Sequence, residues 1–202
     1  MYNHGLTLSD YMRKRTRTLT TALGNALHRA GVHPDMLTIV GFIFVVIAGV
    51  FIGRGQHRLG GVLLIVGLPL DALDGAVARA MQRQDKFGEV LDSTLDRYAD
   101  GIIFGALAYY FASQDALNYV LLALATMIGS QAISYIRSRA GEVGVKMKIG
   151  LFTRMERIVT IIIALLIPPL LIPGMWLLAI GTNFTALQRL WFAYKQLQNR
   201  EV

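Results

Sequence analysis

Four regularly spaced carboxylates are the residues of this sequence best suited to chemistry. Asp71 and Asp74 are three residues apart, and Asp92 and Asp96 are four apart, so each pair shares one face of a helix. Converging carboxylates repel one another, and a hard divalent cation with oxygen ligands, such as Mg²⁺ or Mn²⁺, holds them ionised. Zinc fits poorly, because the chain has no cysteine and the cluster contains no histidine. The spacing therefore predicts a divalent-metal site, and a metal beside carboxylates favours phosphate chemistry.

Small and basic residues between the two pairs fit a phosphorylated ligand. Gly75 and Ala78 allow a ligand to approach the helix backbone closely. Arg79 can hold phosphate oxygens with two parallel N–H groups. Asp100 lies one turn beyond Asp96, and the sequence leaves open whether it takes part in the site behind the four carboxylates.

The composition indicates that these residues lie in a membrane protein. Of the 202 residues, 54% are hydrophobic and 16% are charged, and the mean hydropathy is +0.48. A soluble domain carries about 25% charged residues, and a chain of this length cannot bury so much apolar surface in its own core. These values exclude a soluble enzyme, a disordered tail and a disulfide scaffold. The net charge of +7 fits anionic lipids or ligands, and without a basic patch of interleaved aromatic residues we expect no nucleic-acid partner.

The apolar segments predict an all-α integral membrane protein. Two uncharged runs, 36–53 and 116–136, are each long enough to span a bilayer alone. A third, 158–188, is interrupted by prolines and is interpreted as two spans joined by a turn. We expect six transmembrane helices, over about residues 36–53, 59–80, 88–113, 116–139, 151–170 and 174–197. The second and third are consecutive, so we expect antiparallel neighbours that bring the four carboxylates together.

The positive charges predict the orientation in the membrane. With the N-terminus inside, all of the 20 lysines and arginines except Arg54 and Arg58 lie on the inner side. We therefore expect both termini and the active site on the cytoplasmic face of the cell (plasma) membrane. Apolar residues at helical spacing within 8–30 predict an amphipathic helix on the membrane surface. The chain is interpreted as one membrane domain, 1–202, with a juxtamembrane segment, 1–34, and a six-helix core, 35–198.

The stretch 71–96 resembles the signature of the CDP-alcohol phosphatidyltransferase family, with all eight fixed positions present. The resemblance implies a transferase of phospholipid biosynthesis that uses CDP-diacylglycerol, and the family is often dimeric, so we expect a homodimer. It implies Mg²⁺ or Mn²⁺ on Asp71, Asp74 and Asp92. Asp96, at the edge of this metal site, would be the general base for an alcohol hydroxyl. That hydroxyl would attack the β-phosphorus, and CMP would leave.

Further segments, from about residue 30 to residue 192, resemble the phosphatidylinositol phosphate synthases of actinobacteria within this family. They include His33–Thr38, Ser130–Arg137 and Arg154–Arg157. Carried over by position, the CDP-lipid would contact Pro34, Thr38, Asp74, Gly75, Ala78, Arg79, Gly88 and Ser134. The phosphate of the acceptor, inositol 1-phosphate, would meet Arg137, Arg154, Arg157 and Arg189.

Two departures from the subgroup bear on the acceptor. Arg137 stands where the subgroup has a lysine, and Thr153 stands where it has a glutamate. Glycerol 3-phosphate is the alternative acceptor, because it carries a phosphate that the arginines can also hold. The arginines also fit plain anchoring on the inner side of the membrane. An alternative from another class is a divalent-cation transporter, which would need its carboxylates near the bilayer midplane.

Overall fold

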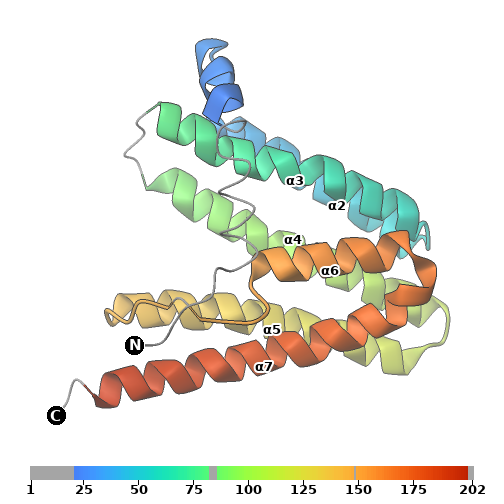
Figure 1. The fold of residues 1–202 in the computed structure, drawn as a ribbon. Helices are drawn as coiled ribbons and strands as arrows, with labels where there is room; N and C mark the ends of the chain where they lie inside the picture. The colour runs from blue at the N-terminus through green and yellow to red at the C-terminus, as the bar shows by residue number, and fades with distance from the viewer. Residues whose placement is uncertain (1–20, 82–85, 148, 200–202) are drawn as a thin grey trace.

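The computed structural model describes residues 21–81, 86–147 and 149–199, and all regular elements in these ranges are helices. They are α2 (Pro34–Gly53), α3 (His57–Ala80), α4 (Phe87–Ser113), α5 (Leu117–Glu142), α6 (Arg154–Leu166), the short 3₁₀ helix η1 (Pro168–Leu170) and α7 (Leu171–Gln198). Figure 1 shows them in chain order. The all-helical expectation is confirmed. Within the described residues, three helical stretches are long and apolar enough to cross a membrane: Pro34–Gly53, Leu117–Glu142 and Pro168–Gln198.

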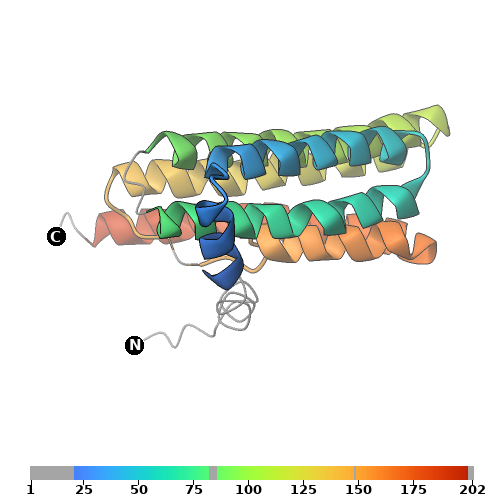
Figure 2. The same cartoon turned by 90° about the horizontal axis from the view of Figure 1, so that it is seen from above.

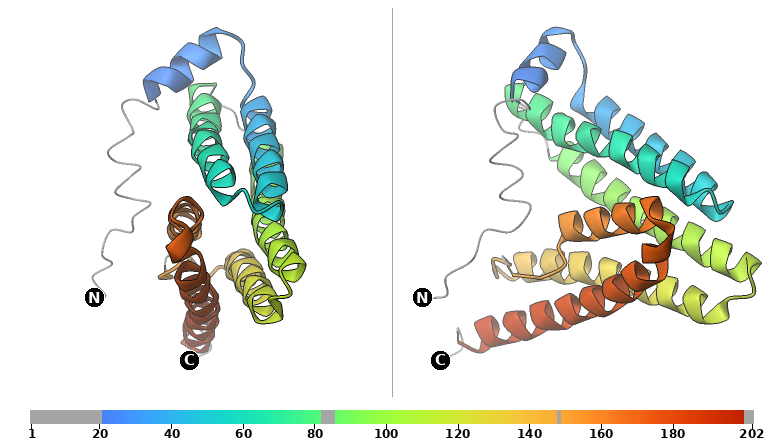
Figure 3. Two further views of the ribbon diagram at one scale, coloured as in Figure 1. Left: turned by 90° about the vertical axis from the view of Figure 1, so that its right-hand side faces the viewer. Right: turned by 45° about the vertical axis from the view of Figure 1, so that its right-hand side comes forward.

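The helices form a closed ring in which each packs on two neighbours. Around the ring the order is α3, α2, α4, α5, α7 and α6, and α6 packs back on α3. Figure 2 shows that the helices run side by side, and the left panel of Figure 3 looks nearly along them. Consecutive helices run in opposite directions, so α2, α4 and α6 begin at the end where α3, α5 and α7 finish. We call this end, which carries the acidic motif, the carboxylate end.

The interior of the ring is apolar at one end and polar at the other. Away from the carboxylate end, fully buried side chains such as Ile52, Leu107 and Leu165 form one hydrophobic cluster. Toward the carboxylate end, the buried side chains include Asp74 and Arg157, among other charged and polar groups. Buried charges need partners, so this end of the ring is where a functional site is expected.

The turn between α6 and α7 begins earlier than the sequence predicts. Ile167 precedes Pro168 and adopts extended backbone angles, φ −114° and ψ 93°, which ends α6. The last helix was expected from residue 174, but α7 starts at Leu171 and takes Pro173 into its first turn. Proline is tolerated there because its missing N–H would have no partner within the helix.

The expected packing of the two acidic helices is wrong. α3 and α4 do not pack along each other; both pack on α2, which lies between them in the ring. Their antiparallel course still brings the end of α3 and the start of α4 to the same end of the ring (Figure 3). Residues 8–20 of the expected amphipathic helix lie outside the described residues. Residues 21–29 are helical, and Gly24 lies so close to Ala76 of α3 that a Cβ there would be 2.8 Å from the Ala76 Cβ.

Candidate active site

The start of α2 and the acidic motif of α3 meet through a hydrogen bond. Pro34 occupies the first position of α2, where its fixed φ suits a helix start. One turn later, the Thr38 hydroxyl donates to Asp74 Oδ2 over 2.6 Å. Asp74 is only 7% exposed, and the Gly75 N–H donates to its other oxygen. Residues far apart in sequence that the resemblance assigns to one CDP-lipid site therefore lie together.

The next turn of α3 leaves room for a ligand. A Cβ on Gly75 would meet only the Arg79 Nη1 atom, at an ordinary 3.4 Å, so no other described element fills the space beside it. Arg79 is exposed, and within the described part of the chain its side chain makes no hydrogen bond or ion pair. Ala78 is half-buried between them. Asp71 lies in α3 one turn before Asp74, and its side chain is outside the described residues.

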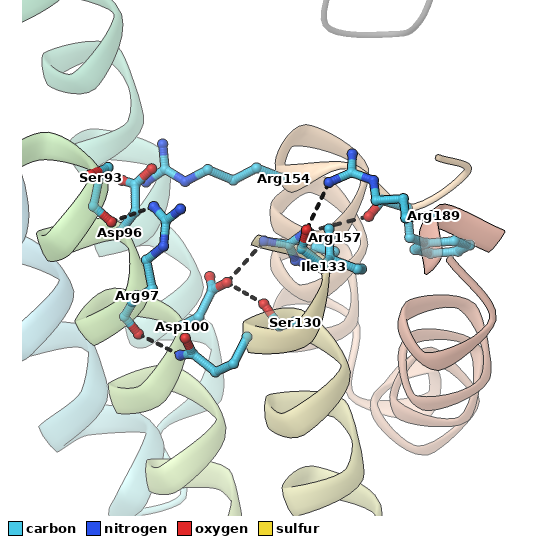
Figure 4. A network of polar contacts seen from close by, with 11 residues as sticks. Ser93, Asp96, Arg97, Asp100, Ser130, Ile133, Arg154, Arg157 and Arg189 are labelled. Carbon is cyan, nitrogen blue, oxygen red and sulfur yellow. Dashed lines mark hydrogen bonds and ion pairs between the residues drawn. The ribbon is translucent and has the colours of Figure 1, made fainter. Parts of the chain in front are cut away.

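Asp96 on α4 faces Arg154, the first residue of α6 (Figure 4). Their Oδ1 and Nη2 atoms are 2.5 Å apart, and both side chains remain partly exposed, at 18% and 32%. Both line a pocket between α2, α3, α4 and α6 that Thr38 also lines, and whose inner wall is apolar. Asp92 precedes Asp96 by one turn and is half-buried. Asp96 of the acidic motif thus opens onto a pocket that is also lined by Thr38, the hydrogen-bond partner of Asp74 on α3.

The four carboxylates of the acidic motif offer the oxygen ligands that a hard divalent cation prefers. Among the described side chains, no three carboxylates or histidines lie close enough together to hold a metal ion. The donor set is nevertheless all oxygen, and Asp74 is buried with its carboxylate already oriented by the Thr38 hydroxyl and the Gly75 N–H. Partners that orient a ligating carboxylate are typical of metal sites. The residues therefore fit Mg²⁺ or Mn²⁺.

A buried ion pair lies one turn deeper than Asp96. Asp100 Oδ2 is 2.9 Å from Arg157 Nη2 and also accepts a hydrogen bond from the Ser130 hydroxyl. Asp100 is 8% exposed, Arg157 3% and Ser130 1%. Arg157 Nη1 donates in addition to the Phe152 carbonyl over 3.3 Å. We call Asp100, Ser130 and Arg157 the Asp100 cluster (Figure 4).

Arg189 on α7 is held by backbone carbonyls. It is 5% exposed, and its Nε and Nη1 atoms donate to the carbonyls of Ile149 and Ile133, each over 2.9 Å. Arg137 and Arg157 lie near enough to repel it electrostatically. Two more of the four predicted acceptor-site arginines thus lie in the neighbourhood of Arg189, and Arg154 reaches toward Asp96 from the helix that carries Arg157.

The sequence prediction missed residues that support these arginines. Gly150 has φ +138°, and a Cβ there would lie 3.1 Å from Arg189 Nε. The Thr185 hydroxyl accepts a hydrogen bond from the Phe152 N–H over 3.1 Å, which fixes the loop against α7. Neither position has a distinctive sequence signal. For Asp100, the available signal was its spacing of four residues from Asp96.

Two predicted CDP-lipid residues are not joined to the pocket by the described contacts. Ser134 lines a groove between α4 and α5, together with Ser93 and Tyr98, rather than the interhelical pocket. Gly88 is the second residue of α4 and is half-buried at the carboxylate end.

Comparison with known proteins gives a family for this site. The model of the CDP-alcohol phosphatidyltransferase family matches residues 31–187. The archaetidylinositol phosphate synthase of Pyrococcus horikoshii is 38% identical over 189 residues, which cover 93% of this chain and 97% of that protein.

Solved structures share both the fold and the sequence. The phosphatidylinositol phosphate synthase of Mycobacterium tuberculosis with CDP-DAG bound matches with a TM-score of 0.81 and 33% identity, over 88% of this chain and 94% of that one. The same enzyme in complex with manganese and citrate matches with a TM-score of 0.78 and 32% identity, over 87% and 88%. The chain therefore belongs to the CDP-alcohol phosphatidyltransferase family and is a membrane transferase.

Proposed function

We propose that this enzyme transfers the phosphatidyl group of CDP-diacylglycerol to a hydroxyl of inositol 1-phosphate, forming phosphatidylinositol phosphate and CMP. The observation that carries the proposal is the contact of Asp96 with Arg154 at the rim of the pocket that Thr38 also lines. A base for the acceptor hydroxyl and a cation for the acceptor phosphate are thus adjacent. Relatives named for inositol phosphate products, from an archaeon and from an actinobacterium, support the acceptor.

In this proposal, the CDP-lipid binds at the acidic motif. Asp71, Asp74, Asp92 and Asp96 would hold Mg²⁺ or Mn²⁺, which would supply positive charge for the diphosphate and for the leaving CMP. The crystal structure of the related mycobacterial enzyme with manganese supports a divalent metal. Arg79 holds a phosphate oxygen, and the space beside Gly75 admits the diphosphate. Pro34, Thr38, Ala78, Gly88 and Ser134 complete the proposed CDP-lipid contacts.

The acceptor binds beside the base. Arg137, Arg154, Arg157 and Arg189 supply the positive charge for its phosphate, and guanidinium groups suit this task because they bond phosphate in a bidentate way. Asp96 takes the proton of the acceptor hydroxyl as its oxygen bonds to the β-phosphorus. The bond between that phosphorus and the CMP oxygen breaks, and CMP leaves with the electron pair.

We also propose how the enzyme lies in the membrane. The six long helices α2 to α7 span the membrane as one domain, 1–202, made of a juxtamembrane segment, 1–34, and a six-helix core, 35–198. α6 has 13 residues, or about 20 Å of helix, so it needs its flanking segments to complete a span of about 30 Å. The carboxylate end faces the cytoplasm of the plasma membrane, which follows from the lysine and arginine distribution. The enzyme works as a homodimer, with residues 8–30 on the membrane surface.

Glycerol 3-phosphate is the second candidate acceptor, because the same arginines fit its phosphate. A transporter is not favoured, since the end of α3 and the start of α4, which carry the acidic motif, lie at one end of the ring (Figure 1). Purified enzyme with CDP-diacylglycerol and Mg²⁺ should be offered inositol 1-phosphate, glycerol 3-phosphate, inositol and serine in turn, and CMP release followed. The proposal expects CMP with inositol 1-phosphate, and CMP with glycerol 3-phosphate alone would overturn the acceptor. A parallel series with a CDP-linked ether lipid would test the donor.

A further inference from the structure

Two ion pairs connect helices that are not neighbours in the ring. α4 packs on α2 and α5, whereas α6 packs on α3 and α7. Asp96 and Asp100, one turn apart on α4, pair with Arg154 and Arg157, one turn apart on α6. Figure 4 shows the two pairs crossing the interior at different depths. The two pairs therefore link α4 directly to α6, in addition to the packing of each helix on its own ring neighbours.

The deeper pair is buried and anchored on three sides. Asp100 Oδ2 receives Arg157 Nη2 from α6 over 2.9 Å and the Ser130 hydroxyl from α5. Arg157 also donates to the Phe152 carbonyl, just before α6 begins. A buried ion pair gives little net stability, because desolvation offsets the attraction, and apolar residues of similar volume pack as well. The pair instead fixes the position of α6 relative to α4, because any shift of α6 would leave the charges of Asp100 and Arg157 buried without partners.

The ion pair nearer the surface, between Asp96 and Arg154, depends on this position of α6. Arg154 is the first residue of α6 and follows a loop, so the position of its side chain depends on how α6 is placed. A slip of one residue rotates a helix by about 100°, which would turn Arg154 away from Asp96. Arg157 is 3% exposed and uses both terminal nitrogens within the protein, so it anchors α6 while it adds positive charge to the proposed acceptor site.

We propose that Asp100 is a positioning residue for the transfer: through Arg157 and Ser130 it fixes α6 so that Arg154 can hold the acceptor phosphate beside Asp96. Asp100 lines the inner part of the same pocket, and in this proposal it acts through Arg157 and Ser130 rather than by binding the acceptor. The inference deepens the proposed function and rests on it. It predicts that loss of Asp100 affects the acceptor far more than the CDP-lipid, because Thr38, Asp74 and Arg79 lie on α2 and α3.

The test is Asp100→Asn, which keeps the size of the side chain and removes its charge. The KM for inositol 1-phosphate should rise at least about tenfold, the scale of one lost charged contact, while the KM for CDP-diacylglycerol changes less than about twofold. Binding of CDP-diacylglycerol with Mn²⁺ should still raise the unfolding temperature, and protection by inositol 1-phosphate should be lost. An unchanged acceptor KM, or equal rises in both KM values with a lowered unfolding temperature, would overturn the proposal.

A second test variant and a control variant accompany Asp100→Asn. Ser130→Ala removes one donor to Asp100 without changing any charge, and it should raise the acceptor KM about threefold or more even if Asp100→Asn does not fold. Glu142→Gln is the control, because it removes an exposed ion pair with Arg139 at the end of α5. It should leave both KM values unchanged, and an equal effect of Ser130→Ala and Glu142→Gln would overturn the proposal. Wild-type enzyme that is inactive with inositol 1-phosphate would refute the proposed function itself, whereas active wild type with an unaffected Asp100→Asn would refute only the positioning role.

Discussion

Thr38→Val is the substitution that most sharply tests how α2 supports the acidic motif. The Thr38 hydroxyl donates to Asp74 Oδ2 over 2.6 Å, and Asp74 is only 7% exposed. Valine keeps the branched shape but removes this donor, so a buried carboxylate loses a hydrogen bond. Such a bond to a charged group contributes about 1.5–3 kcal/mol, or roughly 10- to 150-fold in an equilibrium constant.

The loss should appear as weaker metal binding. In the proposed mechanism Asp74 is a metal ligand, and removing a partner of a metal ligand typically weakens metal affinity or activity about 10- to 100-fold. CMP release should be measured across a Mn²⁺ titration at saturating CDP-diacylglycerol and acceptor. Thr38→Val should then need about 10- to 100-fold more Mn²⁺ for half-maximal activity than wild type.

Thr38→Ser is the matched control, because serine retains the hydroxyl and loses only a methyl group. We expect its Mn²⁺ requirement to stay within about threefold of wild type, since the donor to Asp74 remains. A Thr38→Val enzyme with the wild-type Mn²⁺ requirement would refute the reasoning. So would Thr38→Ser impaired as severely as Thr38→Val, because packing of the methyl group would then matter rather than the hydrogen bond.

Four other substitutions probe the remaining parts of the site. Asp92→Asn should abolish CMP release by removing a metal ligand, and near-normal turnover would contradict that role. Asp96→Asn should keep CDP-lipid binding, measured by thermal protection, but stop turnover; weak binding with residual turnover would make it a ligand only. Arg154→Ala should raise the acceptor KM roughly 10- to 150-fold with little change for the CDP-lipid, and parallel rises would argue against an acceptor contact. Gly150→Ala should strain the backbone by about 1–3 kcal/mol and displace Arg189. The acceptor KM should therefore rise and the unfolding temperature should fall. A wild-type acceptor KM would show that Arg189 tolerates the added methyl group.

The helices and the acidic motif could be predicted from local sequence signals. Proline at the start of α2 and the uncharged run after it mark one helix clearly. The carboxylate spacing marks a helix face whatever the surrounding fold. The boundary at α7 was misplaced because the prolines permit more than one turn position: Pro173 breaks a helix interior but is tolerated in a first turn.

The arrangement of the helices could not be predicted in the same way. Consecutive helices usually pack together, yet α3 and α4 are separated by α2 in the ring. A carboxylate-lined face gains little by packing against another such face, whereas the apolar α2 can pack on both. The Asp100–Arg157 pair joins residues 57 positions apart, so no periodicity within one helix could reveal it.

The most direct test of the central claim follows the oxygen of the acceptor hydroxyl. Inositol 1-phosphate labelled with ¹⁸O at the free hydroxyls should be incubated with CDP-diacylglycerol, Mg²⁺ and enzyme, and both products analysed by mass spectrometry. If an acceptor hydroxyl attacks the β-phosphorus, the phosphatidylinositol phosphate retains every label, including one bridging the inositol ring and the lipid phosphate, and CMP carries none. Loss of one label from the lipid product, or CMP release with no labelled lipid formed, would contradict the proposed transfer.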